Sequence, residues 1–231
     1  MIFDRLIKRS KTVNSINPLL FRHISSLKNI TLYDIGAHKG LFSKNVSNQF
    51  HIERGILVEP IKENYEIIQK YFNSENFIVY NNVVTDSDNK MFHFNINNYD
   101  ETSSILKIKN GIKELISVDT ELRKEIEIES VTLDSITKKN NIEQIDLIKI
   151  DVQGVEDKVL KGALYTLQRT KYVWVETSFK SLYDGSALFS DIYNIMNSND
   201  FIMVEISPGY RDAAKGELLQ ADVLFRSSIL K

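Results

Sequence analysis

Short apolar runs alternate with stretches of helical periodicity along most of this chain. The apolar runs have either the composition of buried strands or the strict alternation of half-buried ones. They occupy residues 30–35, 55–60, 76–84, 91–97, 126–131, 145–150 and 172–177. Between them, apolar residues recur every three or four positions. This spacing predicts helices at residues 61–72, 132–140, 155–167 and 192–196. The alternation of strands and helices predicts an α/β fold.

Two further strands are predicted near the C-terminus, at residues 201–206 and 221–226. The loop between them, residues 207–220, holds no helical stretch long enough for a crossover connection. Parallel neighbours need such a crossover, so we expect these two strands to pair as an antiparallel hairpin.

Two segments depart from the regular pattern. Residues 97–125 are irregular, polar and rich in serine, aspartate and lysine. A connection of that length inside a compact domain is usually functional, so we expect a substrate wall or a lid. Residues 1–28 predict one or two short amphipathic helices, which we interpret as a cap on a main domain of residues 29–231 or on a second copy in a homodimer. A peripheral membrane contact through residues 1–11 is the alternative.

Composition excludes several classes of protein. Lysine and arginine number 29 against 31 aspartates and glutamates, a formal net charge of −2, which argues against a nucleic-acid partner. The chain has no cysteine, and its four histidines do not fall at metal-ligand spacing, so no metal site is expected. Neither a signal peptide nor a membrane span is visible, and the composition fits a single cytoplasmic enzyme.

The first predicted strand leads into a glycine-containing loop and then into a helix. Glycine at positions 36 and 40 allows close approach of the backbone to a ligand at the start of that helix. The spacing is G-x-x-x-G and not the G-x-G-x-x-G of dinucleotide-binding loops. It suits S-adenosylmethionine, which carries an ammonium and a sulfonium but no pyrophosphate. We therefore assign Asp34, Gly36, Ala37 and Gly40 to a cofactor site.

An acid ends the second predicted strand, about 20 residues after the glycines. Glu59 stands where a carboxylate accepts hydrogen bonds from the two hydroxyls of a ribose. The alternative is a solvated acid that favours the start of the next helix through the helix dipole. We place Pro60 in the same cofactor site, together with Asn82 and Val83 at the end of the third predicted strand.

A third acid, Asp151, ends the strand at residues 145–150. Ligands of open α/β sheets bind beyond the carboxyl ends of the strands, where we expect Asp34, Glu59 and Asp151 to converge. Three acids at one edge need a cation among them, and the sulfonium is one. The alternative is that Asp151 caps the N–H groups of Gly154 and its neighbour. Glu156 lies in the first turn of the next helix. A role in the active site and a favourable interaction with the helix dipole are equally good interpretations of it.

These motifs together resemble the FkbM-type methyltransferases. The resemblance runs from about Leu32 to Arg226. It rests on four stretches: Asp34-Ile-Gly-Ala-His-Lys-Gly, Val58-Glu-Pro, Val131-Thr-Leu-Asp, and Asp146-Leu-Ile-Lys-Ile-Asp-Val-Gln-Gly-Val-Glu followed by Leu160-Lys-Gly-Ala. It implies a Rossmann-like class I methyltransferase fold, with a seven-stranded mixed sheet flanked by helices and an antiparallel last strand. It also implies S-adenosylmethionine as methyl donor and a hydroxyl of a sugar, glycan or natural product as acceptor.

Two residues depart from the family pattern: His38 stands where asparagine is usual, and Gln153 where glutamate is frequent. Neither change removes an acid of the motifs. Both leave open how the acceptor is held. The serine-containing stretch that begins at Glu101 resembles a family element and is expected to line the acceptor pocket.

Transfer of a methyl group to an alcohol needs a base, because a neutral hydroxyl is a poor nucleophile. The candidates, in order of preference, are Asp151, His38, Glu156 and Glu176. An exposed loop histidine without a catalytic role is an equally good interpretation of His38. Three other functions compete with O-methylation: methylation of a nitrogen, nicotinamide-dependent oxidation, and nucleotide binding without catalysis. The absent Asn/Asp-Pro-Pro-aromatic motif weighs against the first, and the broken glycine pattern weighs against the second.

Overall fold

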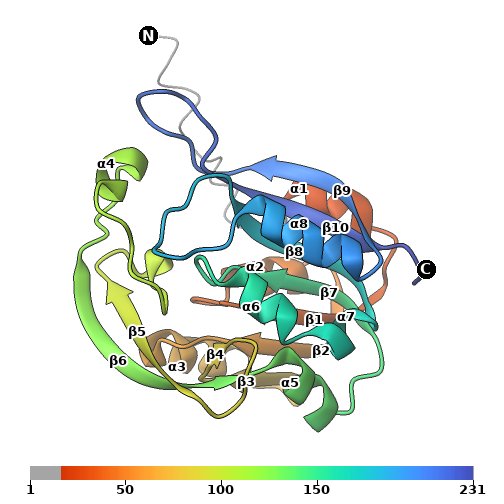
Figure 1. Ribbon diagram of the computed structural model, residues 1–231. Helices are drawn as coiled ribbons and strands as arrows, with labels where there is room; N and C mark the ends of the chain where they lie inside the picture. The colour runs from red at the N-terminus through yellow and green to blue at the C-terminus, as the bar shows by residue number, and fades with distance from the viewer. Residues whose placement is uncertain (1–16, 231) are drawn as a thin grey trace.

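The fold is built on a seven-stranded mixed sheet, seen in a computed structural model that describes residues 17–230 (Figure 1). The strand order is β3-β2-β1-β7-β8-β10-β9, and β10 runs antiparallel to both of its neighbours while the others are parallel. In that order the strands are Phe77–Tyr80, His51–Val58, Asn29–Ile35, Ile145–Ile150, Thr170–Ser178, Gln220–Ser227 and Phe201–Pro208. This arrangement confirms the expected fold class and the C-terminal hairpin.

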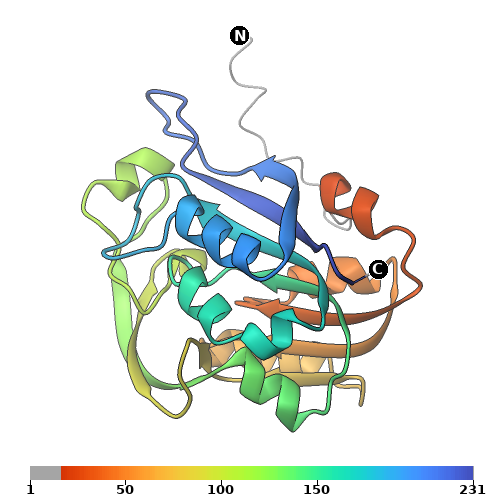
Figure 2. The ribbon, with the colours of Figure 1, turned by 45° about the vertical axis from the view of Figure 1, so that its right-hand side comes forward.

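Helices cover both faces of this sheet because side chains alternate along each strand. In β1, Tyr33 and Ile35 pack in one buried cluster, whereas Ile30 and Leu32 pack in another on the opposite face. The first face is covered by α5, α6, α7 and α8, and the second by α1, α2 and α3 (Figures 1 and 2). In chain order these helices are Pro18–Ile24, Leu41–Ser47, Lys62–Tyr71, Leu133–Lys139, Glu156–Lys161, Leu164–Leu167 and Phe189–Ser198.

The prediction of one strand over residues 76–84 is wrong. The segment divides into β3 and a two-residue strand, β4 (Val83–Val84), which joins a separate three-stranded sheet of order β4-β6-β5. Asn81 turns the chain between them, since its amide nitrogen donates to the carbonyls of Glu59 and Pro60, both at 2.9 Å. The other members are β5 (Met91–Asn97) and β6 (Leu122–Val131), which is longer than predicted.

The single helix predicted over residues 155–167 is also wrong, because it is interrupted at Gly162 between α6 and α7. A Cβ atom at Gly162 would lie 2.3 Å from the carbonyl oxygen of Thr85, so only glycine allows this close approach. The sequence contains the glycine but does not show which backbone will approach it. Hydrophobic periodicity therefore continues across a break that packing imposes.

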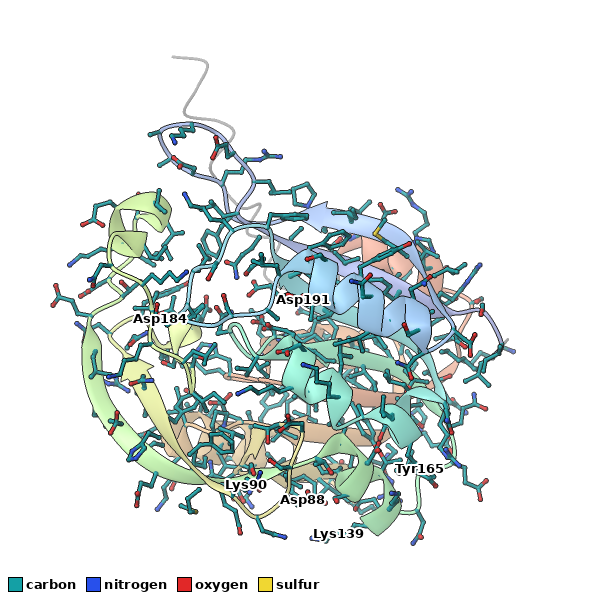
Figure 3. All side chains as sticks on the ribbon, in the orientation of Figure 1. Asp88, Lys90, Lys139, Tyr165, Asp184 and Asp191 are labelled. Atoms are coloured by element: carbon teal, nitrogen blue, oxygen red, sulfur yellow. The ribbon has the colours of Figure 1, made fainter. Side chains whose placement is uncertain are left out.

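The turn between β4 and β5 is fastened to the start of α5. Asp88, labelled in Figure 3, accepts hydrogen bonds from the Thr132 backbone N–H at 2.7 Å and the Ser135 hydroxyl at 2.7 Å. Thr132 is itself the N-cap of α5, as its side chain accepts from the Ser135 N–H. These contacts fix the β4–β5 turn of the small sheet to the first turn of α5.

The described part of the N-terminal segment packs on the sheet. Leu20 and Ile24 of α1 are fully buried beside Ile30 and Leu32. The predicted membrane contact of residues 1–11 lies outside the described residues. Within residues 17–230, no helix combines the length and the apolar character that crossing a bilayer requires.

Candidate active site

A cavity of about 370 Å³ lies at the carboxyl edge of the main sheet. Its walls include the glycine loop after β1, the ends of β2, β7 and β8, the start of β10, the small sheet, the insert of residues 97–125, and the loops after β8 and β9. Of the residues assigned to the site from sequence, the lining includes Gly36, Ala37, His38, Glu59, Pro60, Asn82, Val83, Asp151 and Glu176. The structure therefore brings together most of the predicted site.

The glycine loop has the close backbone contacts that its sequence predicts. Gly36 has a φ of +77°, and a Cβ there would lie 1.9 Å from the carbonyl oxygen of Asp151. The N–H groups of Gly36 and Ala37 both donate to the carbonyl of Val58 at 3.0 Å. Gly40, also left-handed, is the N-cap of α2 and lies behind the cavity wall. The loop thus joins the ends of β1, β2 and β7 with no room for a side chain at position 36.

Glu59 is buried, with 4% of its surface exposed, so it is not a solvated helix-start acid. Its carboxylate accepts from the N–H of His38 at 2.8 Å and from the N–H of Ile61 at 2.9 Å. Burial raises the pKa of Glu59 to about 8, although these N–H donors act in the opposite direction. Glu59 therefore holds the glycine loop to the start of α3 and presents its carboxyl group to the cavity.

The cation among the predicted acids is supplied by the chain itself, which the sequence argument missed. The ammonium of Lys149 in β7 lies 3.2 Å from Asp151 Oδ2 and 3.8 Å from Asp34 Oδ1. It also donates to the carbonyl of Gly36 at 3.2 Å. Burial lowers the pKa of Lys149, but the carboxylates of Asp151 and Asp34 outweigh that effect and raise it. The sequence does contain a sign of this internal cation, because Lys149 is the lysine of the Asp-x-x-Lys-x-Asp stretch.

Asp34 lies beneath the cavity and not in its wall. It is fully buried, and its Oδ2 accepts a hydrogen bond from the Ser43 hydroxyl at 2.6 Å. Burial raises the pKa of Asp34, and the nearby ammonium of Lys149 opposes that change. The assignment of Asp34 to direct cofactor contact is therefore corrected: it anchors Lys149 and the start of α2.

Asp151 faces the cavity, and its side chain is 31% exposed. Its Oδ1 accepts from the amide nitrogen of Gln153 at 2.7 Å, and the same nitrogen donates to Glu176 Oε2 at 2.8 Å. Gln220 of β10 also donates to that Glu176 oxygen, at 2.9 Å. Burial raises the pKa of Glu176 well above its ordinary value, and the carboxylates of Asp151 and Asp222 add to the effect. Two of the four predicted bases are thus joined through one glutamine.

Glu156, another predicted base, is turned away from the cavity. Its carboxylate accepts from the N–H groups of Val152 and Gly154 at 3.0 to 3.2 Å. Burial raises the pKa of Glu156 to about 7 against the opposing effect of these donors. The capping role considered for Asp151 therefore belongs to Glu156, which shapes the loop between β7 and α6.

His38, the remaining predicted base, contacts the insert. Its Nε2 lies 3.1 Å from Asp100 Oδ1 and its Nδ1 lies 3.8 Å from Glu101 Oε1. The ammonium of Lys39 lies 3.4 Å from the other Asp100 oxygen. Both acids lie in the short 3₁₀ helix η2 (Asp100–Thr102). The side chain of His38 thus ties the glycine loop to the insert.

The insert forms one wall of the cavity with η2 and α4 (Ile112–Ile116). Its lining residues are Tyr99, Asp100, Glu101, Thr102, Ser103, Ile105, Ile108, Ile112 and Ile116. Tyr183 and Tyr210, from loops after β8 and β9, line the same side. No sequence signal distinguished these two tyrosines, because each lies in a loop without a recognisable motif. Among the described residues, no group of three histidine, aspartate or glutamate side chains could hold a metal ion.

Comparison with known proteins agrees with this geometry. Residues 34–203 match the family described as Methyltransferase FkbM domain, a span that includes the glycine loop, Glu59, Lys149, Asp151 and Glu176. The chain belongs to the FkbM methyltransferase family. A curated relative, the 2-O-methyltransferase NoeI of Sinorhizobium fredii (strain NBRC 101917 / NGR234), is 32% identical over 104 residues. That match covers 45% of this FkbM-family chain and 42% of the relative.

Solved structures share the fold of this FkbM-family chain at low identity. Methyltransferase FkbM from Methylobacillus flagellatus KT superposes with a TM-score of 0.52 at 14% identity, covering 92% of this chain and 48% of that one. The magnesium protoporphyrin IX methyltransferase ChlM of Synechocystis PCC 6803, solved with bound S-adenosylmethionine, gives 0.50 at 9% identity over 90% and 75%. A putative tRNA (m1A22) methyltransferase, Sp1610 of Streptococcus pneumoniae, gives 0.50 at 12% identity over 94% and 72%. These likenesses confirm the Rossmann-like methyltransferase fold.

Proposed function

We propose that this protein is an S-adenosylmethionine-dependent O-methyltransferase acting on a hydroxyl of a sugar, glycan or natural product. Membership of the FkbM methyltransferase family supports methyl transfer. The name of the relative NoeI, a 2-O-methyltransferase, supports oxygen as the accepting atom. The observation that carries the proposal is Asp151, an ion-paired carboxylate that faces the cavity at the end of β7.

The residues on the glycine-loop side fit the proposed cofactor. Glu59 offers a carboxyl group that would accept from a ribose diol, and Pro60 and Val83 beside it give an apolar wall suited to a flat base. Gly36 and Ala37 would allow the close approach of the amino-acid part of the cofactor. The carboxylate of Asp151 suits a neighbouring positive charge. The cavity volume is within the range of small-molecule sites.

When bound, S-adenosylmethionine supplies an electrophilic methyl group. The protein has to place the acceptor oxygen about 3 Å from that methyl, in line with the bond that breaks. It must also take the hydroxyl proton as the new bond forms. Asp151 is the base that the geometry favours, because it lies in the cavity wall beside Gly36 of the glycine loop. Tyr99, Tyr183 and Tyr210 line the same cavity and would bind the acceptor.

The test is a transfer assay with purified protein, S-adenosylmethionine labelled in its methyl group, and panels of methyl glycosides, oligosaccharides and simple amines. We expect label in a glycoside or oligosaccharide product, on an oxygen located by NMR, and loss of transfer with Asp151→Asn. Label on nitrogen would replace the proposal by N-methylation. Binding of S-adenosylmethionine with no transfer to any acceptor would favour a binding protein without catalysis.

A further inference from the structure

Gln153 occupies the centre of the side-chain network in the cavity wall. Its amide nitrogen has two hydrogens and two carboxylate partners, Asp151 Oδ1 at 2.7 Å and Glu176 Oε2 at 2.8 Å. Its amide oxygen lies 2.8 Å from the hydroxyl of Tyr183, which can donate to it. The amide nitrogen thus faces the two acids, and the amide oxygen, which can only accept, faces the tyrosine hydroxyl.

The backbone holds Gln153 in this position. It has a φ of +59°, the left-handed region that costs energy for a residue with a side chain. Its carbonyl accepts a hydrogen bond from the hydroxyl of Ser104 in the insert at 2.7 Å. The N–H groups of Val152 and Gly154 on either side are held by the carboxylate of Glu156. The backbone around Gln153 is therefore held at three points: its own carbonyl and the N–H groups of its two neighbours.

The tyrosine contacted by Gln153 belongs to the acceptor side of the cavity. Tyr183 is buried with Ile112 and Leu182 in one small apolar cluster, and its hydroxyl also lies 3.1 Å from the carbonyl of Thr102. The next residue, Asp184, labelled in Figure 3, donates its N–H to the carbonyl of Lys107 in the insert at 2.9 Å. One glutamine thus connects the end of β7, the end of β8 and the insert.

We propose that Gln153 is a positioning residue of the methyl-transfer site: its amide holds Asp151 and Glu176 at fixed places and couples them to the acceptor insert through Tyr183. This inference rests on the proposed function and adds to it which residue sets the geometry of the acids. Gln153 does this as a neutral donor. An ionised glutamate at the same place would lose both hydrogen bonds and set a third carboxylate against two others.

The test uses isothermal titration of the full chain with S-adenosylmethionine, in buffers that differ in ionisation enthalpy, which measures the protons released on binding. In Gln153→Glu, three adjoining carboxylates would share a proton near neutral pH, as closely coupled acids do. A sulfonium cation entering the site would displace it. We expect Gln153→Glu to release about half to one proton more than the wild type at pH 7, since one shared proton is the most the added acid can contribute.

The matched control is Gln69→Glu, which makes the same atomic change on the exposed side of α3, where the amide of Gln69 donates to the Tyr65 hydroxyl. It should release as many protons as the wild type. S-adenosylhomocysteine, which lacks the sulfonium charge, should give a smaller difference between Gln153→Glu and the wild type. If Gln153→Glu does not fold, Gln153→Met replaces it. That change removes the shared donor without adding charge and should shift proton release in the same direction by a smaller amount.

The outcomes separate this inference from the function on which it rests. Failure of the wild type to bind S-adenosylmethionine would overturn both. Binding by the wild type with equal proton release in Gln153→Glu, or in Gln153→Met where that variant is used, would overturn the role of Gln153 alone. Increased proton release with S-adenosylmethionine, absent from Gln69→Glu, would support the role, because it requires the side chain at position 153 to share a proton with Asp151 and Glu176.

Discussion

At the residue scale, the acids of the site divide into those that face the cavity and those that support it. Asp151, Glu59 and Glu176 line the cavity, whereas Asp34 and Glu156 lie behind it and bind Lys149 or backbone N–H groups. All of them lie in the last residues of a strand or in the six residues after one, so their positions along the sequence do not separate them. What separates them is the direction of each side chain, and that follows from the alternation along the strand and the shape of the next turn.

Asp151→Asn is expected to bind S-adenosylmethionine within several-fold of the wild type. Asparagine keeps the shape and can still accept from Gln153, while Lys149 retains Asp34 as an ionic partner. Turnover should fall by roughly 10²–10⁴, the usual contribution of general acid–base catalysis. Titration calorimetry and single-turnover kinetics measure the two quantities separately. A weaker dissociation constant with unchanged single-turnover chemistry would instead assign Asp151 to the ammonium of the cofactor.

Glu59→Ala is expected to weaken S-adenosylmethionine binding by roughly tenfold to a hundredfold. The reason is that the ribose hydroxyls lose their acceptor in a closed site, and an unsatisfied buried polar group costs about 1.5–3 kcal/mol. The variant should also melt at a lower temperature, because the N–H groups of His38 and Ile61 lose their acceptor. Glu66→Ala, at an exposed position of α3, is the matched control. A dissociation constant equal to that of the wild type would leave Glu59 with a purely structural role.

At the element scale, the loop between β7 and α6 gains its shape from one buried carboxyl group. The pKa of Glu156 is about 7, above the value of about 4.3 for glutamate in an unfolded chain. The folded state therefore binds more protons than the unfolded state between these two values. Its stabilising contribution is complete below the unfolded pKa and is lost as the pH rises through the folded one.

We expect the free energy of unfolding of the ligand-free protein to decrease between pH 5 and pH 8, with Glu156 contributing up to about 3 kcal/mol. Glu156→Gln keeps an oxygen that can accept from Val152 and Gly154 but does not titrate, so its decrease should be smaller. Glu63→Gln, on the exposed side of α3, is the control. Urea denaturation at several pH values measures the difference. Parallel pH profiles for the wild type and Glu156→Gln would contradict this explanation.

Most elements could be predicted from the sequence because periodicity records burial directly. The predicted elements are wrong where the structure of one segment depends on contacts with another. Asn81 turns the chain by donating hydrogen bonds to carbonyls after β2, and Gly162 allows close approach of the backbone at Thr85. The site shows the same division. The glycines and strand-end acids were predictable from local motifs, whereas Lys149 as the internal cation and Tyr183 as a partner of Gln153 depend on which strands and loops become neighbours.

At the scale of the whole molecule, the cavity is bounded by segments from most of the described chain. Asn17 near α1, Pro60 after β2, Asp100 in the insert and Gln220 in β10 all line it. The cavity lining includes residues of both sheets and of the insert, so a bound ligand could bridge them. Ligand binding should therefore stabilise the folded molecule as a unit.

S-adenosylmethionine and S-adenosylhomocysteine are each expected to raise the melting temperature, whereas NAD should not. A ligand that binds only the native state stabilises it by about 2.7 kcal/mol at a concentration of 100 times its dissociation constant. For a chain of this size, that corresponds to a rise of roughly 5–10 °C. NAD carries a pyrophosphate, and the loop at Gly36 and Gly40 lacks the middle glycine that lets a backbone approach a pyrophosphate. His38 stands in that position, and its backbone N–H donates a hydrogen bond to Glu59. Differential scanning fluorimetry at matched ligand concentrations measures all three. An equal rise with NAD would favour a nicotinamide-dependent oxidoreductase, and no rise with either sulfur ligand would contradict the cofactor assignment.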